Sequence, residues 1–230
     1  MTRSGSAATL YARLRDACAS EWAAYTQHSF VLQLADGTLP EVCFRHYLIQ
    51  DYLFLIHFAR AYGLAAFKSE TLDDIRRAAG GLSAIVDTEM DLHVGYCARW
   101  GLAEEDMAAA PEAPATMAYT RYVLERGLAG DLLDLQVALA PCIVGYAEIG
   151  RALAGDPATV RQGNPYDDWI AMYASEDYQN VAFDHVQQMD TLMRRRGSDG
   201  RLDALVRTFG EATQLDAEFW DMGLSAEDRG

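Results

Sequence analysis

The chain has 230 residues, half of them hydrophobic, and a formal net charge of −15. This length and composition allow one sizeable core. The acidic balance argues against a phosphate backbone as partner, and the basic run at 194–196 is short, so no nucleic-acid binding is expected. We read no signal peptide and no apolar run of membrane-spanning length, so no membrane partner is expected either.

Four cysteines are scattered along the chain without a C-x-x-C pair or any short spacing: Cys18, Cys43, Cys97 and Cys142. In a chain of this size that pattern is typical of reduced thiols and not of a disulfide framework. It predicts a cytoplasmic protein.

Apolar residues recur at helical spacing along nearly the whole chain, and no segment shows sustained strand-like alternation. Loops are predicted at 34–40 and 110–114, and a break at the glycine pair 80–81. The sequence therefore predicts an all-α bundle of about seven helices. The helical segments expected in chain order are 9–27, 41–69, 82–101, 115–129, 131–154, 166–196 and 201–223.

The segment "LAPCIVGYAEIG" (139–150) places a proline inside an apolar helical run, directly before Cys142. A proline there clashes with the preceding turn at a cost of about 3 kcal/mol, so Pro141 is expected to distort the helix. Tyr146 shares the Cys142 face, whereas Glu148 points to a different side. A lone cysteine in such a helix is most often a small core side chain. If Cys142 is a nucleophile, its proton partner comes from another helix.

Asp51 stands in "YLIQDYLFLIHF" among aliphatic and aromatic residues. A buried charge costs several kcal/mol unless it is paired, so Asp51 must face solvent, shift its pKa or meet a polar partner. One interpretation is a structural hydrogen bond to a neighbouring helix. The other is a carboxylate at the bottom of an aromatic pocket for a flat, nitrogen-rich ligand.

Tyrosine is abundant, with 12 residues, and those in apolar helices are more often core than catalytic. Glu89 and His93 stand four apart, and Asp184 and His185 follow later, but this spacing does not match a helical di-iron motif. We expect no metal site, and interpret Glu89 and His93 as a pair on a helix surface.

Blocks spread over most of the chain resemble the TenA family, the thiaminase II enzymes. They are "HSFVLQLADGTLP" (28–40), "FRHYLIQDYLFLIHFARA" (44–61), "APCIVGYAEIG" (140–150), "WIAMYAS" (169–175) and "FWDMG" (219–223). The resemblance implies a heme-oxygenase-like helical bundle, with residues 1–230 forming a single TenA-like domain that assembles as a homotetramer. No cofactor is implied.

Members of this family release hydroxymethylpyrimidine from aminomethylpyrimidine, or cleave thiamin at the same methylene carbon. The resemblance implies that Cys142 is the nucleophile and that Asp51 holds the aminopyrimidine ring. It also implies that Phe54, Tyr119, Tyr146 and Tyr173 line the pocket. It does not rank the two substrates, which share the ring.

The chain departs from the family pattern before "FW", where the family has a catalytic glutamate. Asp216 stands at that position, and Glu218 lies two residues further on, about 200° round an ideal helix. Asp216 is one methylene shorter, and an error of about 1 Å can cost about 100-fold in rate. Either Asp216 acts from a slightly shifted helix, or the substrate or activity has changed. A protein that binds pyrimidine or thiamin without turnover, and a cofactor-free or metal-dependent oxidase, therefore remain as alternatives.

Overall fold

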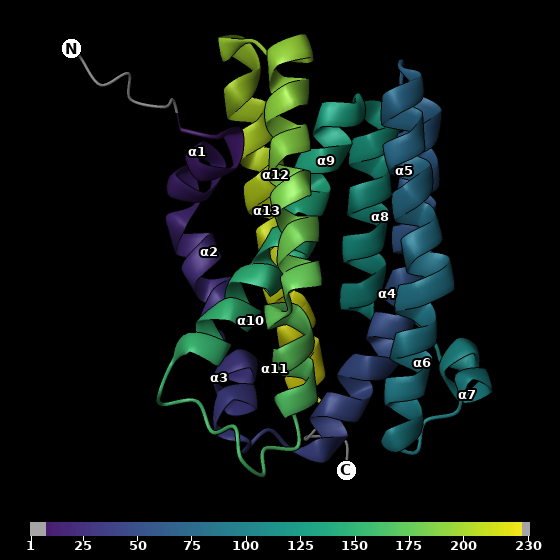
Figure 1. Ribbon diagram of the computed structural model, residues 1–230, viewed down its shortest axis with the longest axis vertical. Helices are drawn as coiled ribbons and strands as arrows, with labels where there is room; N and C mark the ends of the chain where they lie inside the picture. The colour runs from purple at the N-terminus through teal and green to yellow at the C-terminus, as the bar shows by residue number, and fades with distance from the viewer. Residues whose placement is uncertain (1–7, 227–230) are drawn as a thin grey trace.

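The computed structural model describes residues 8–226, and every regular element in that range is helical (Figure 1). The bounds are α1 Leu10–Ala17, α2 Ala19–Thr26, α3 Ser29–Asp36, α4 Glu41–Lys68, α5 Leu72–Ala84, α6 Met90–Arg99, α7 Glu104–Ala109, α8 Pro114–Ala129, α9 Leu132–Ala140, α10 Tyr146–Gly155, α11 Asp167–Ala174, α12 Glu176–Arg196 and α13 Asp199–Leu224. Two π-helical turns, Ile85–Glu89 and Pro141–Gly145, join α5 to α6 and α9 to α10. The predicted all-α class is confirmed.

Two of the predicted long helices are interrupted by single residues. The segment predicted over 9–27 divides at Cys18, which leaves helical geometry between α1 and α2. The segment over 166–196 divides at Ser175, whose side chain accepts a hydrogen bond from the backbone N–H of Tyr178 and so caps α12. Serine competes for backbone hydrogen bonds in this way, which favours helix starts over helix interiors.

The break predicted at glycines 80–81 is wrong, because α5 continues through both residues. A glycine inside a helix costs only about 1 kcal/mol relative to alanine. A Cβ atom on Gly81 would lie 2.2 Å from Cε1 of Tyr62, a residue of α4. The small residue therefore permits α5 to approach α4 closely.

The core is organised around α4 and α13. The helix α4 has 28 residues and buries side chains over most of its length, as the sequence predicts. The helix α13, yellow in Figure 1, runs through the middle of the bundle and packs against α2, α4, α8 and α9. The two long helices thus bring residues near position 50 close to residues near position 216.

The start of α9 is fixed by a capping box and an arginine. The Asp131 side chain accepts from the backbone N–H of Asp134, and the Asp134 side chain accepts from the backbone N–H of Asp131. Arg201 of α13 donates to both carboxylates at 2.8 Å. Capping of this kind satisfies backbone donors that have no partner within the helix. It anchors α9 to α13 at one end.

Contrary to the sequence-based expectation, one continuous run, Leu132–Gly155, is long and apolar enough to cross a membrane by length and composition alone. However, 89% of its most hydrophobic window is buried inside the bundle. Burial in the protein core accounts for this composition, since a helix that is hydrophobic all round is commonly a core helix.

The helices α10 and α11 meet closely at Gly150. A Cβ atom there would lie 2.6 Å from the carbonyl carbon of Tyr173 and 2.8 Å from the backbone nitrogen of Ala174. Neighbouring backbone, unlike a flexible side chain, cannot move aside without shifting α11. Gly150 therefore sets the position of Tyr173.

Replacing Gly150 with alanine should lower the free energy of unfolding by about 1–3 kcal/mol, the usual cost of overpacking. The matched control is Gly155→Ala, at the exposed end of the same helix, where a Cβ atom would meet nothing within 4 Å. That control should leave stability unchanged or raise it by up to about 1 kcal/mol. Urea unfolding measures both, and equal effects would contradict the close-approach argument.

Candidate active site

All seven residues predicted for the site line one cavity between α4, α8, α10, α11 and α13. They are Asp51, Phe54, Tyr119, Cys142, Tyr146, Tyr173 and Asp216. The other lining residues are Leu55, Phe58, Glu89, Tyr178 and Phe219. The space between these walls is about 420 Å³, counting the part open to solvent. Residues more than 160 positions apart in sequence are thus brought together, while their chemical roles remain predictions.

Cys142 lies in a π-helical turn, Pro141–Gly145, and not at a simple proline kink. Proline has no N–H to donate, and its ring clashes with the carbonyl four residues earlier in a regular α-helix. A turn with a different hydrogen-bond pattern therefore accommodates Pro141. Two tyrosines donate hydroxyl groups to carbonyls of the turn: Tyr25 to Pro141 and Tyr178 to Cys142, each at 3.5 Å. Such turns occur frequently at functional sites, because they re-aim a side chain without ending the helix.

Gly145 closes the turn and makes room for Tyr25. A Cβ atom on Gly145 would lie 2.4 Å from Cε1 of Tyr25, whose ring is fully buried and stacks on Trp220. The glycine therefore has a packing function, because it lets the turn that holds Cys142 lie against Tyr25.

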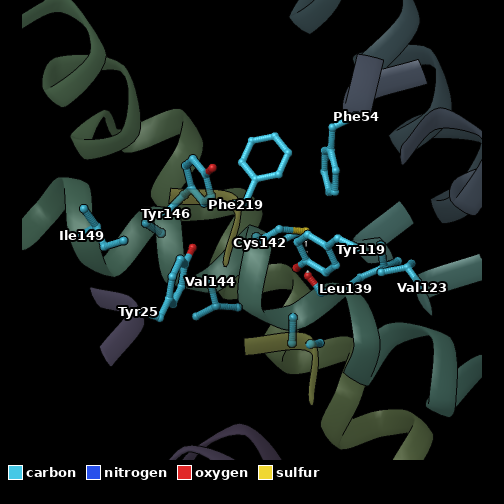
Figure 2. Close-up of a cluster of buried hydrophobic side chains, with 14 of the residues drawn as sticks. Tyr25, Phe54, Tyr119, Val123, Leu139, Cys142, Val144, Tyr146, Ile149 and Phe219 are labelled. Atoms are coloured by element: carbon cyan, nitrogen blue, oxygen red, sulfur yellow. Dashed lines mark hydrogen bonds between the residues drawn. The ribbon is translucent and has the colours of Figure 1, made fainter. Parts of the chain in front are cut away.

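The Cys142 thiol is neutral in the resting protein. Burial, and next the nearby Asp216 carboxyl, raise the pKa of Cys142 well above its usual value. Its Sγ lies 3.1 Å from the carbonyl oxygen of Leu139, to which it donates. Figure 2 shows the sulfur beside Tyr119, with the rings of Phe54 and Phe219 nearby. A neutral thiol is a weak nucleophile, so reaction at this sulfur requires a base.

Asp216 is the carboxyl group that faces the cavity from α13. It is 2% exposed, and its Oδ2 accepts a hydrogen bond of 2.7 Å from the Tyr119 hydroxyl. Burial raises its pKa well above the usual value, with the Tyr119 hydrogen bond acting in the opposite direction. Glu218 is exposed on the far side of the helix. Of these two acids, Asp216 lines the cavity and Glu218 does not, while the catalytic role of Asp216 stays a prediction.

Asp51 is 8% exposed, in the middle of α4. Burial raises the pKa of Asp51 to about 7, and a 3.4 Å hydrogen bond from Tyr47 partly opposes the shift. His93 Nδ1 lies 3.6 Å from Asp51 Oδ2, and its Nε2 lies 3.1 Å from the carbonyl oxygen of Leu48. Because that carbonyl can only accept, Nε2 carries the proton and Nδ1 offers Asp51 a lone pair. This arrangement favours the protonated form of Asp51.

The interpretation of Glu89 and His93 as a surface pair is wrong. Glu89 lines the cavity, and His93 faces Asp51. Burial, and then the Asp51 charge, raise the pKa of Glu89 to about 7. His185, considered with them, is buried elsewhere and bonds to the carbonyl of Gln136. Helical periodicity in the sequence could have placed Glu89 on an inward face, because Ile85, four residues earlier, is a core position.

The aromatic walls are in mutual contact. Ring centroids lie 4.8 Å apart for Tyr146 and Tyr173, and 5.1 Å apart for Phe54 and Tyr119. Tilted and edge-on contacts of this kind hold rings in fixed positions. The cavity is therefore a rigid aromatic box suited to a flat ring.

Three carboxyl groups line this cavity, and none of its described lining residues is lysine or arginine. Unpaired buried carboxyls keep their protons or meet a cation from outside. All four cysteines are buried, and no disulfide bond joins any of them.

These observations define a helical bundle that encloses an acidic, aromatic-walled pocket with a buried thiol. The TENA/THI-4/PQQC family model matches residues 15–226. The chain is 36% identical over 206 residues to the aminopyrimidine aminohydrolase of Halalkalibacterium halodurans, covering 89% of this chain and 90% of that protein. It is 39% identical over 203 residues to an uncharacterized protein of Haemophilus influenzae, covering 88% and 93%. The chain therefore belongs to the TENA/THI-4/PQQC family.

Solved structures agree with this assignment. A TenA family transcription regulator from Silicibacter sp. TM1040 superimposes with a TM-score of 0.88 at 44% identity, covering 94% of this chain and 96% of that one. A domain with a heme oxygenase-like fold from Shewanella denitrificans gives a TM-score of 0.70 at 14% identity, covering 95% and 93%. The latter likeness concerns the fold alone, and the expected heme-oxygenase-like bundle is confirmed.

Replacing Asp51 with asparagine should change how stability depends on pH. The folded protein keeps the Asp51 proton to about pH 7, whereas the unfolded chain loses it near 3.8. The folded state thus binds more protons between these values, and the free energy of unfolding falls as pH rises through this window. At about pH 8 the Asp51→Asn variant should be more stable than the wild type by up to about 4 kcal/mol, with little difference at about pH 4.

Urea unfolding at the two pH values measures this effect. Asp91→Asn removes an exposed carboxyl from α6 and serves as the control. If the free energies of unfolding of the wild type and of Asp51→Asn change with pH in parallel, the result would contradict the raised pKa of Asp51.

Proposed function

We propose that this protein hydrolyses the C–N bond between an aminopyrimidine's methylene carbon and its amine or thiazolium substituent, releasing hydroxymethylpyrimidine for thiamin salvage. The observation that carries the proposal is that the Cys142 thiol, the Asp216 carboxyl and the Asp51 carboxyl line one aromatic-walled cavity from different helices. The relative from Halalkalibacterium halodurans that is named aminopyrimidine aminohydrolase supports the substrate class.

In the proposed mechanism Asp51 activates the ring. Its raised pKa leaves it able to donate a proton to a ring nitrogen near neutral pH. A ring that is protonated or strongly hydrogen-bonded at nitrogen accepts electrons more readily. His93 and Tyr47 hold the carboxyl in place, and the aromatic walls hold the ring flat.

Cys142 then adds to the activated ring. The thiol proton passes to Asp216, and the sulfur forms a bond to a ring carbon. Burial raises the pKa of both groups, so the carboxyl is a stronger base than an exposed aspartate, which makes the transfer less unfavourable. The Tyr119 hydroxyl, bonded to Asp216 Oδ2, fixes the orientation of this base.

The bond to the substituent breaks when ring electrons move toward the methylene carbon. The C–N electron pair leaves with the nitrogen: a protonated amine departs as ammonia, and a thiazolium departs as the neutral thiazole. Water adds to the methylene carbon and gives up a proton to a carboxylate of the site. Expulsion of the Cys142 sulfur restores the ring, and the thiol regains its proton.

The experiment is a comparison of Cys142→Ser with the wild type on aminomethylpyrimidine and thiamin, side by side. A serine hydroxyl is a far weaker nucleophile at its ordinary pKa, so release of hydroxymethylpyrimidine should fall by at least about 1000-fold. Product is measured by chromatography. The side-by-side assay also ranks the two substrates.

The matched control is Cys18→Ser, which alters another buried thiol whose Sγ bonds to the carbonyl of Val206 between α1 and α13. It should keep full activity. Full activity in Cys142→Ser would refute the nucleophile. Binding of the pyrimidine by the wild type without any product would favour the binding-protein alternative.

The proposal includes a homotetramer, as the family resemblance implies, in the cytoplasm, as the cysteine pattern predicts. Large apolar side chains exposed on the chain, such as Phe67 at 84% and Leu128 at 66%, support an assembly. Size-exclusion chromatography with light scattering should give four times the 25.4 kDa chain mass, and a monomer would contradict this part of the proposal.

A further inference from the structure

A second, larger cavity lies beside the first. The space between its walls is about 1110 Å³, again including space open to solvent. The two cavities share Asp51, Leu55, Glu89, Tyr173 and Tyr178 as walls. A ring held by Asp51 in the inner cavity could thus extend its substituent into the outer one.

Glu89 stands at this junction, at the end of the π-helical turn Ile85–Glu89. Within residues 8–226 no hydrogen-bond donor or basic side chain pairs with its carboxyl group. Its main charged neighbour is Asp51, which repels it. The described walls of the outer cavity, like those of the inner one, contain no lysine or arginine, and they add the acid Asp177. The junction therefore lacks a positive charge.

We propose that Glu89 selects substrates with a positively charged substituent on the methylene carbon, by pairing its carboxylate with that charge. This inference rests on the proposed function and names the substrate class of the same site. A protonated primary amine and the quaternary nitrogen of a thiazolium share this chemistry. A neutral hydroxyl group at the same carbon does not.

The charge on the substituent disappears as the reaction proceeds. The C–N electron pair moves onto the nitrogen, so both ammonia and thiazole leave uncharged. Pairing with Glu89 therefore stabilises the bound substrate more than the transition state. Removing the charge of Glu89 should raise KM and leave kcat unchanged or higher, whereas loss of a catalytic acid or base would lower kcat. The uncharged product cannot form this pair, so it binds more weakly than the substrate does. This difference favours product release.

The test is Glu89→Gln, which keeps the shape of the side chain and removes its charge. Affinities are measured by calorimetry in the Cys142→Ser background for aminomethylpyrimidine, thiamin and hydroxymethylpyrimidine. Kinetic constants are measured in the otherwise wild-type protein. Affinity for the cationic compounds should fall about 10- to 100-fold, the range for a charge-assisted hydrogen bond. Affinity for neutral hydroxymethylpyrimidine should change less than about threefold.

The matched control is Glu105→Gln, an exposed acid on α7, which should change none of these values. Loss confined to aminomethylpyrimidine assigns the amine as the paired group, and loss confined to thiamin assigns the thiazolium. Equal loss for the neutral and cationic compounds, or a fall in kcat at constant KM, would overturn the role of Glu89 and leave the proposed function standing. A wild type that binds none of the three overturns both.

Discussion

The site depends on carboxyl groups that the protein buries without giving them a basic partner. Elsewhere in the same chain, acids away from the cavity are paired: the buried Asp74 bonds to Arg195 at 2.9 Å, and the partly buried Asp131 to Arg201 at 2.8 Å. Among the residues that the structure describes, Asp51 and Asp216 each accept a hydrogen bond from a tyrosine hydroxyl, and a lone pair of His93 faces Asp51. Burial without a counter-charge is unfavourable for the ionised form. The contrast between paired structural acids and unpaired cavity acids is what separates a site from the scaffold around it.

The scaffold keeps the thiol helix rigid although its hydrogen-bond ladder is interrupted. Tyr25 and Tyr178 donate to carbonyls of the π-helical turn, so its polar groups do not face the core unsatisfied. One turn further on, Glu148 accepts hydrogen bonds from Tyr11 of α1 and Trp22 of α2. The sequence correctly places Glu148 away from the Cys142 face. This acid holds α10 against the N-terminal helices and leaves the opposite face of the run free for the cavity.

The sequence predicts the helical class and the central position of α4 because both follow from apolar periodicity, which local composition encodes. It does not predict the divisions at Cys18 and Ser175, since each depends on a cap or a local geometry that competes closely with helix continuation. The two π-helical turns are also missed, and the turn Pro141–Gly145 is stabilised by tertiary partners such as Tyr25, which local sequence does not reveal. The glycine pair at 80–81 misleads for a related reason: Gly81 lies inside a helix and packs closely on Tyr62.

The site residues are predicted by two kinds of argument, residue types with their spacing and the family resemblance, and the resemblance supplies more of them. Residue types and spacing identify Cys142 and Asp51 as unusual, but only the family resemblance connects them with Asp216 and the aromatic walls. Neither residue spacing nor the family resemblance identifies Glu89 as a site residue. Its i,i+4 spacing to His93 indicates a pair on the helix surface instead. Helical periodicity from Ile85 indicates the face on which Glu89 lies, but the cavity that it lines depends on how the turn Ile85–Glu89 packs on α4, which is a property of the fold and not of the local sequence.

A cavity with buried acids and aromatic walls is a compromise between stability and binding. Burial raises the pKa values of the Cys142 thiol and of the cavity carboxyls, which lowers the charge that the empty cavity holds at neutral pH. The same groups become donors and acceptors once a nitrogen-rich ring excludes water, because electrostatic interactions strengthen in a low dielectric. A lysine or arginine in the wall would stabilise the folded chain by pairing with these acids, and would occupy the position that a basic ring is proposed to take. Lysine and arginine are absent from the described cavity walls, and in the proposed function the ligand supplies the positive charge.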